Sequence, residues 1–310
     1  MHRTIIMKRI PLIALALCLA TTSDVRAEES SNADYPLGVF NFDFARLGAD
    51  EASQISELES IGYGGLVMNL SANNVRKAKS ALETLHRYQA AIGAGSFNVY
   101  AGYVVFFFNT SAEMRKAQNE HIDKVIQSLK ESNAKLWVIL RGGKGRVPKE
   151  SVKPEQIVKF LRSLAERTKA AGVELVIYPH YGALVESAEE ALTYLKEAQN
   201  GNIFLSLHLC HEIRAGNGDR LNEVAAKIKP WLRLPSINGA DIDSVNEVIG
   251  WKRGIQPLTM GDYDSSQLLD ALKSVDYRGP VILHTWGLQK AAADHHHTSF
   301  KRFYEMLDAK

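Results

Sequence analysis

The sequence has few cysteines and no strong excess of charge. Its 310 residues include 2 cysteines, and the formal net charge is +2 at pH 7. Residues 1–27 hold four basic residues and one acidic residue, so the remaining chain has a net charge of about −1. A chain this close to neutral lacks the basic surface of a nucleic-acid-binding protein, and we expect no nucleic-acid partner. Cys210 is the one cysteine after residue 27, so that part forms no internal disulfide and depends on a hydrophobic core.

Long apolar stretches are also scarce, except near the N-terminus. There a basic start precedes the apolar run Ile10–Ala20, which is too short to span a bilayer, and small and polar residues follow up to Ala27. This order of segments is typical of a secretory signal peptide; a retained membrane anchor is the alternative. We expect residues 1–27 to be cleaved and residues 28–35 to form a flexible lead-in. The protein would then be periplasmic or secreted, with no lasting membrane span.

Short apolar runs alternate with helical patterns along residues 36–310, and no linker rich in proline, glycine or serine interrupts them. The predicted strands are Gly38–Phe42, Gly65–Met68, Val99–Phe107, Leu136–Leu140, Val173–Ile177, Ile203–Leu207, Trp231–Leu234 and Pro280–Leu283. The predicted helices are Ala49–Ile61, Ser71–Ile92, Ser111–Leu129, Lys153–Ala171, Val185–Gln199, Arg220–Ile228, Ser265–Ser274 and Ala291–Leu307. This alternation indicates a parallel sheet, and eight units suffice to close one (β/α)₈ TIM barrel domain. No Gly-x-Gly-x-x-Gly turn follows a strand, which disfavours a dinucleotide-binding fold.

Polar side chains recur where the predicted strands end, and histidine is frequent among them. His180 follows the fifth run, His208 and His211 follow the sixth, and His284 follows the eighth. Because the C-terminal ends of barrel strands line the active-site mouth, we expect these imidazoles to converge there. Imidazole suits Zn, Mn, Fe or Ni better than Mg, so we predict a divalent metal held by some of these four histidines. A hydrogen-bonded structural histidine is the alternative for each.

Other polar residues of the expected mouth are candidates for catalysis and substrate binding. Asp241 and Glu212 lie in segments after strands, and we predict that one of them moves a proton as general acid and base. Solvated loop acids are the alternative for both. The residues expected to bind substrate are Arg141, Tyr178, Asn238 and Trp286. A guanidinium group can hold a substrate oxygen or carboxylate, and an indole ring can stack on the apolar face of a sugar.

Three consecutive histidines, His295, His296 and His297, fall within the last predicted helix. Adjacent residues on a helix point in different directions, so the three side chains cannot all serve one site. We therefore interpret this triplet as a polar helix surface; functional metal binding is the alternative.

Several strings resemble the xylose-isomerase-like barrel superfamily, the sugar phosphate isomerase/epimerase group. The resemblance is carried by Gly261-Asp262-Tyr263-Asp264 and Tyr277-Arg278-Gly279-Pro280, by His180, and by the stretch up to Cys210-His211. It implies a TIM barrel that binds a divalent metal through carboxylates and a histidine at strand ends. It also implies proton transfer next to a carbonyl.

The chain departs from that pattern where the family has its carboxylate ligands. Tyr178 stands at the position of the strand-five glutamate, His208 at that of the strand-six aspartate, and His284 at that of the strand-eight glutamate. The strand-seven histidine would fall near Ser236. The resemblance therefore implies either a rebuilt, imidazole-rich metal site or a barrel that binds its ligand without metal.

Three functions follow from these observations. The first is an exported, metal-dependent isomerase or epimerase that acts on a neutral carbohydrate or keto-sugar by proton transfer next to a carbonyl; a lyase or hydratase would use the same site. The second is a non-catalytic carbohydrate-binding barrel that lost the carboxylate ligands. The third, an endonuclease-IV-like activity on damaged DNA, is disfavoured by the predicted export and the near-zero charge.

Overall fold

The computed structural model describes residues 34–72, 75–130, 132–143, 147–245 and 251–309. The predicted signal peptide and most of the predicted lead-in lie outside these described residues. Within the described ranges, no helix is both long and apolar enough to cross a membrane.

Eight strands form one parallel sheet that closes on itself. They are β1 (Leu37–Phe40), β2 (Gly65–Asn69), β3 (Asn98–Phe107), β4 (Lys135–Arg141), β5 (Leu175–Ile177), β6 (Ile203–Leu205), β7 (Ser236–Ile237) and β8 (Val281–Leu283). The strand order is β6-β5-β4-β3-β2-β1-β8-β7, which leaves β6 and β7 at the two ends. Two isolated parallel bridges, Leu205 to Leu232 and His208 to Ser236, join those ends. The predicted (β/α)₈ barrel is confirmed.

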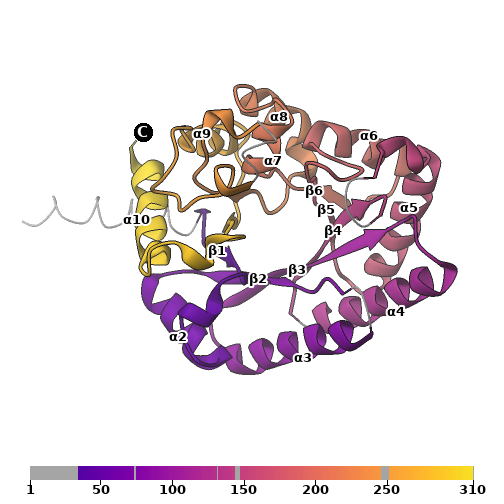
Figure 1. The fold of residues 1–310 in the computed structure, drawn as a ribbon, viewed down its shortest axis with the longest axis horizontal. Coiled ribbons are helices and arrows are strands. Elements are labelled where there is room, and N and C mark those ends of the chain that lie inside the picture. Colours follow the sequence, from indigo (N-terminus) through magenta and orange to yellow (C-terminus); the bar gives the residue numbers. More distant parts are fainter. Residues whose placement is uncertain (1–33, 73–74, 131, 144–146, 246–250, 310) are drawn as a thin grey trace, which may run out of the picture.

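Helices form a ring outside the sheet (Figure 1). They are α2 (Glu51–Ile61), α3 (Val75–Ile92), α4 (Ala112–Leu129), α5 (Pro154–Ala170), α6 (Ala188–Ala198), α7 (Leu209–Arg214), α8 (Leu221–Ile228), α9 (Ser266–Ser274) and α10 (His295–Asp308). Local chemistry sets their ends: the Ser111 side chain accepts the N–H of Met114 at the start of α4. At the end of α2, Gly62 adopts a φ of 112°, which glycine tolerates without strain.

The hydrophobic core has two layers. The larger layer lies between the sheet and the helices, and a smaller cluster fills the barrel interior. In the interior, the rings of Phe40 and Trp137 stack with centroids 5.6 Å apart and planes inclined by 4°. These buried aromatic rings form the floor beneath the C-terminal ends of the strands.

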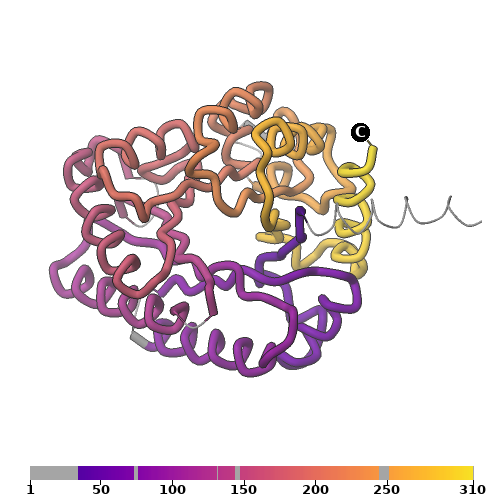
Figure 2. Tube along the Cα trace, turned by 180° about the vertical axis from the view of Figure 1, so that it is seen from behind, coloured from indigo at the N-terminus to yellow at the C-terminus, as the bar shows by residue number. Residues whose placement is uncertain are grey.

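The first and last described segments meet at one side of the barrel. Strand β1 and helix α10 lie side by side in both views (Figures 1 and 2). The backbone N–H of Leu37 donates to the Tyr304 hydroxyl over 3.3 Å. This contact joins the two ends of the barrel sequence.

The structure corrects the seventh predicted strand. Residues Trp231–Leu234 do not form a strand of the sheet: Lys229–Trp231 is a 3-10 turn, η3, and Leu234 has a φ of 48°. Strand β7 begins after Pro235 instead. Prolines at positions 230 and 235 lack the N–H that a central strand needs, so this apolar run is buried without regular pairing.

The interpretation of the histidine triplet as a polar surface is wrong for two of its members. His295 and His296 are each 1 % exposed, and both approach the buried carboxylate of Asp43. His297 is exposed, as expected for a polar helix surface.

Candidate active site at the barrel mouth

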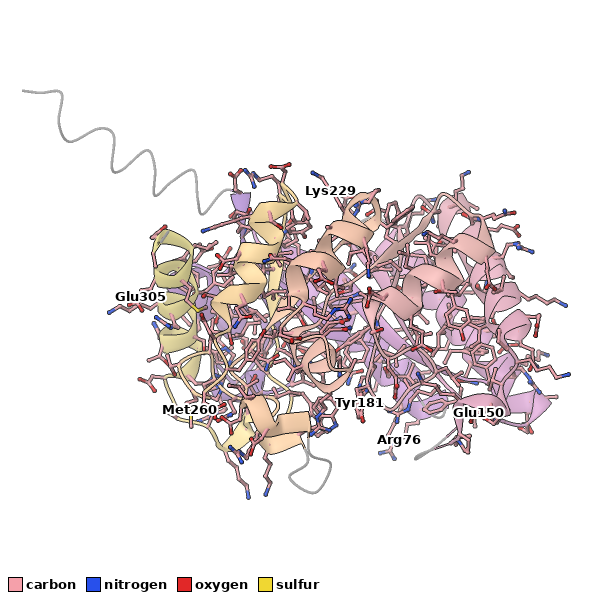
Figure 3. All side chains as sticks on the ribbon, turned by 90° about the horizontal axis from the view of Figure 1, so that it is seen from above. Arg76, Glu150, Tyr181, Lys229, Met260 and Glu305 are labelled. Carbon is pink, nitrogen blue, oxygen red and sulfur yellow. The ribbon has the colours of Figure 1, made fainter. Side chains whose placement is uncertain are left out.

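The residues that follow the strands gather at one end of the barrel. In Figure 3, Tyr181, Glu150 and Met260 lie at that end, and Lys229 lies at the other. A cavity of about 250 Å³ opens at the end marked by Tyr181. Its lining residues are Phe42, Tyr103, Val105, Ile139, Arg141, Tyr178, His180, His211, Trp251, Ile255, His284 and Trp286.

A larger cavity, of about 670 Å³, lies at the N-terminal ends of the strands. Its lining includes Pro36, Gly64, Asn98 and Pro280, and among the described residues it contains no histidine or cysteine. TIM-barrel enzymes carry their active sites at the C-terminal ends of the strands. The smaller, histidine-lined cavity, here called the mouth pocket, is therefore the candidate active site.

Tyr178 lies at the centre of the mouth pocket. Its ring stacks on the His208 ring, with centroids 3.7 Å apart and planes inclined by 6°. Its hydroxyl lies 3.2 Å from His284 Nε2. Because His284 Nδ1 accepts the backbone N–H of Trp286 over 3.3 Å, the neutral ring carries its proton on Nε2 and donates it to Tyr178. Burial raises the pKa of Tyr178 well above its usual value, so the phenol stays protonated.

Two further histidines, His180 and His211, lie close to each other beside the Tyr178 ring. The rings of His180 and His211 have centroids 4.2 Å apart. His180 Nδ1 donates to the backbone oxygen of Tyr181 over 2.8 Å, which leaves the Nε2 lone pair free to accept a proton. His211 Nδ1 accepts the Tyr181 N–H over 3.3 Å.

Burial keeps the mouth imidazoles neutral. It lowers the pKa of His284 to about 3, and burial together with the charge of Arg141 lowers the pKa of His180 to about 4. Burial also lowers the pKa values of His208 and His211 well below the usual range. Neutral imidazoles are the form that binds metal ions and accepts protons.

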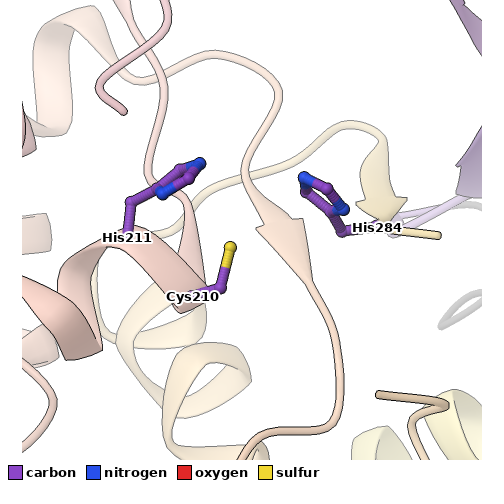
Figure 4. A group of neighbouring side chains, drawn as sticks. All are labelled: Cys210, His211 and His284. Carbon is purple, nitrogen blue, oxygen red and sulfur yellow. The ribbon is translucent and has the colours of Figure 1, made fainter. Parts of the chain in front are cut away.

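One group of mouth side chains fits a divalent metal. The donor atoms of Cys210, His211 and His284 all lie within 4.8 Å of one another, and all three residues are buried. Figure 4 shows Cys210 and His211 on α7 with His284 facing them from the end of β8. The Nε2 atom of His211 has no hydrogen-bond partner among the described residues. Three protein ligands of nitrogen and sulfur type are typical of catalytic zinc sites, which keep a further position open.

The four predicted metal ligands differ in whether they could bind an ion at the mouth. His211 and His284 belong to the metal-fitting group, and His180 lines the mouth pocket beside them. His208 Nδ1 is hydrogen-bonded to Ser236 Oγ, and its Nε2 is buried without a partner among the described residues. All four imidazoles therefore converge at the mouth.

Three of the four predicted substrate-binding residues line the mouth pocket, and the fourth does not. Arg141, Tyr178 and Trp286 line the mouth pocket, and Trp286 is 47 % exposed at its rim. Asn238 is fully buried, and its amide donates to the backbone oxygens of Gly239 and Gly254. Asn238 thus holds the segment after β7 in place.

The two predicted acid–base carboxylates have other partners. Asp241 is paired with Arg253, which lowers the pKa of the carboxyl. Glu212 is buried and accepts the N–H of Ala188 and the amide of Asn217, each over 2.7 Å. Neither carboxylate is part of the lining of the mouth pocket described above.

Cys210 and Trp251 are among the mouth residues that the sequence analysis does not predict as functional. Cys210 enters it through disulfides and the family resemblance, but not as a ligand, although it stands beside His211 at the start of a helix. Trp251 lines the mouth pocket, and the Arg214 guanidinium lies 3.9 Å from its ring centroid. Trp251 lies far from any strand end in the sequence, so no strand-end pattern points to it.

Residues 49–303 match the family described as xylose isomerase-like TIM barrel. The chain belongs to this family. A search of curated proteins found no match.

Solved structures with the same fold include three informative examples. A 3-keto-D-glucoside 4-epimerase from E. coli, YcjR, is 14% identical, with a TM-score of 0.66 over 88% of this chain and 99% of that chain. The IOLI protein, solved with a bound zinc atom, is 15% identical, with a TM-score of 0.68 over 88% and 98%. A probable 3-DHS dehydratase from Bacillus anthracis, AsbF, is 12% identical, with a TM-score of 0.63 over 87% and 98%. At these identities the likeness shows the fold.

Proposed function

We propose that the protein is an exported isomerase or epimerase that acts on a small neutral sugar or keto-sugar by proton transfer next to a carbonyl. The observation that carries this proposal is the mouth pocket, which combines neutral imidazoles, a buried tyrosine and aromatic walls in about 250 Å³. A cavity of this size is suited to a monosaccharide-sized ligand rather than to a long polymer.

The lining of the mouth pocket favours a neutral substrate. Among its described residues Arg141 is the one charged side chain, and Arg141 Nη2 already donates to the Gly182 backbone oxygen over 3.4 Å. A sugar phosphate would need several such donors. Phe42, Trp251 and Trp286 offer apolar faces of the kind that stack on sugar rings.

Two side chains are placed to move a proton. His180 presents a free Nε2 lone pair and is held in orientation by its bond to the Tyr181 carbonyl. It would take the proton from the carbon next to the carbonyl, as a general base. The protonated hydroxyl of Tyr178, oriented by His284, would donate a hydrogen bond to the substrate oxygen on which negative charge develops. Return of the proton to the adjacent carbon, with transfer of the neighbouring hydroxyl's proton to the former carbonyl oxygen, gives isomerisation. Delivery of a proton to the opposite face of the same carbon, by a second donor on that face, gives epimerisation.

Cys210, His211 and His284 are the residues that would hold a divalent metal at this site. One nitrogen of His284 would then exchange its hydrogen bond, to Tyr178 or to Trp286, for the ion. When bound, such an ion supplies Lewis acidity to a carbonyl or a neighbouring hydroxyl. The thiol and two imidazoles favour zinc or a similar transition ion over magnesium. The solved relative described with a bound zinc atom supports this choice.

One observation favours a second candidate, a sugar-binding barrel without catalysis. Among the described residues, the lining of the mouth pocket holds no carboxylate, whereas the resemblance implies carboxylate ligands in active members. A loss of these ligands removes catalysis more readily than binding.

Deuterium exchange separates the two candidates. The protein, purified without a histidine tag, is incubated in D₂O with a panel of neutral aldoses, ketoses and keto-glycosides, and proton NMR follows the hydrogens next to each carbonyl. We expect exchange for at least one sugar, with a loss of about 100-fold or more in His180→Gln, because general-base catalysis contributes roughly that factor.

The exposed His297→Gln variant is the matched control and should exchange at the wild-type rate. Metal analysis of wild type and Cys210→Ser tests whether the mouth holds an ion. Saturable sugar binding without exchange, with or without added zinc, would contradict the enzyme and establish the binding barrel.

A further inference from the structure

A second cluster of buried polar side chains lies away from the mouth pocket. It joins Asp43, in the segment after β1, to His295 and His296, in the first turn of α10. The side chains are 0 %, 1 % and 2 % exposed, in that order. Groups this polar are rarely buried so fully unless they are paired or bind a ligand.

Both imidazoles approach the same carboxylate oxygen. His295 Nε2 lies 2.6 Å from Asp43 Oδ2, and His296 Nε2 lies 3.3 Å from that atom. The two rings face each other, with centroids 4.1 Å apart. One possible ligand atom from each of the three residues lies within 4.8 Å of those of the other two.

An ion pair alone leaves much of this cluster unsatisfied. Asp43 Oδ1, His295 Nδ1 and both ring nitrogens of His296 are buried and have no hydrogen-bond partner among the described residues. A buried polar atom without a partner destabilises a folded protein. Of these atoms, His296 Nε2 faces Asp43 Oδ2 without a hydrogen bond, and an ion bound between the two residues would satisfy it.

We propose that Asp43, His295 and His296 form a second, structural site for a divalent transition ion, with zinc as the favoured ion. Bonds from zinc to nitrogen and oxygen of about 2.0–2.2 Å place tetrahedral ligand atoms roughly 3.3 Å apart. The His296–Asp43 distance of 3.3 Å already has this value, and the His295–Asp43 distance of 2.6 Å would open by about 0.7 Å. The set of two imidazoles and one carboxylate suits zinc, cobalt or iron(II) rather than magnesium.

The hydrogen bonds around this cluster indicate a structural role for the second site. Arg46 donates to the backbone oxygens of Leu288 and Ala291 over 3.2 and 2.8 Å, and Gln289 donates to the backbone oxygen of Phe42 over 3.2 Å. The segment after β1 is therefore tied to the segment before α10 on both sides of the cluster. The contact between these two segments is here called the seam. An ion at the second site would hold the two segments together and keep Phe42, which lines the mouth pocket, in place.

Metal stoichiometry tests the second site independently of the mouth. A mouth variant, Cys210→Ser/His284→Gln, removes two of the mouth donors and leaves the second site intact. A seam variant, Asp43→Asn/His296→Gln, does the reverse, and His297→Gln is the exposed control on the same helix. Each full-length protein, purified without a histidine tag, is stripped with a chelator, titrated with Zn²⁺ or Co²⁺, and checked for folding by circular dichroism.

We expect the mouth variant to bind one equivalent of zinc at the second site. The seam variant should lack this equivalent, and His297→Gln should match the wild type. Cobalt in the mouth variant should give visible d–d bands without a sulfur-to-cobalt charge-transfer band, because the second site contains no thiolate. Zinc should also raise the melting temperature of the mouth variant.

A folded mouth variant that binds neither zinc nor cobalt would overturn the proposal and leave Asp43 and His295 as a buried hydrogen-bonded pair. Should the mouth variant not fold, wild type and His296→Gln are compared instead: equal zinc stoichiometry would overturn the second site. Neither result depends on turnover of a sugar, so a failure of the proposed enzyme activity is distinguishable.

Discussion

The buried carboxyl of Glu212 provides a sharp test of the electrostatics beneath the mouth pocket. Glu212 is fully buried in α7, where it accepts one hydrogen bond from Ala188 and one from Asn217. Burial raises its pKa from 4.5 to about 7, although the two hydrogen bonds act in the opposite direction. A difference of about 2.5 pKa units corresponds to about 3 kcal/mol at 1.36 kcal/mol per unit.

The sign of the effect follows from proton binding. Because the folded pKa lies above the unfolded one, the folded chain keeps its proton between pH 4.5 and about 7, where the unfolded chain has released it. The stability contributed by this proton is complete below pH 4.5 and is lost as the pH rises to about 7. Glu212→Gln cannot titrate and should not show this loss.

The measurement is urea unfolding of wild type and Glu212→Gln at pH 4.5 and pH 8, followed by circular dichroism. Between these pH values the variant should gain about 3 kcal/mol relative to the wild type in its free energy of unfolding. Other titrating groups cancel in the difference between the two proteins. An equal difference at both pH values would refute the reasoning, because Glu212 would then have the same pKa in the folded and unfolded chains.

Two further substitutions test packing around the mouth. Tyr178→Phe keeps the ring stack but leaves His284 Nε2 without its partner, so it should lower the free energy of unfolding by about 1–3 kcal/mol in a guanidinium titration; an unchanged midpoint would contradict the hydrogen bond. Gly239→Ala would place a Cβ 2.1 Å from the Pro257 backbone oxygen and should cost about 1–3 kcal/mol by thermal melting. Gly201→Ala, whose Cβ meets nothing within 4 Å, is its control, and equal melting temperatures would show that the segment near Pro257 yields freely.

The sequence was most informative where a strand and the following helix are both continuous. Strands β2, β3 and β4 and helices α4 and α5 lie within one to two residues of their predicted bounds, because the apolar runs of the strands are continuous and the period-3.6 patterns of the helices are long. The helix predicted to begin at Ser111 starts one residue later, and the Ser111 side chain caps it. Local patterns thus predict elements that local interactions specify.

Features that depend on distant partners were missed. His295 bonds to a carboxylate 252 positions earlier in the chain, so no local pattern reveals that it is buried. Cys210 joins the mouth because α7 turns its first residues towards β8, and the sequence after β6 carried no clear helical period. Prolines 230 and 235 moved β7 beyond the apolar run that marked it. In each case tertiary context decided the outcome.

The aromatic floor explains why imidazoles suit positions at which the resemblance implies carboxylates. The His208 ring lies 4.8 Å from Trp137, and the His284 ring lies 4.8 Å from Phe40, measured between centroids. An ionised carboxylate in this apolar setting would carry a large desolvation cost unless an ion were always bound. A neutral imidazole stacks on the rings, remains uncharged when no metal is present, and still offers a nitrogen lone pair.

The replacement of carboxylates by histidines therefore fits the aromatic floor. Because neutral imidazoles carry little desolvation cost there without a metal ion, the mouth can fold before any ion binds. This separates folding of the mouth from metal loading, in contrast to the second site, where the carboxylate of Asp43 is buried beside two imidazoles and an ion would compensate its charge. Removal of metal with a chelator should accordingly leave the mouth pocket folded and weaken the seam between β1 and α10 first.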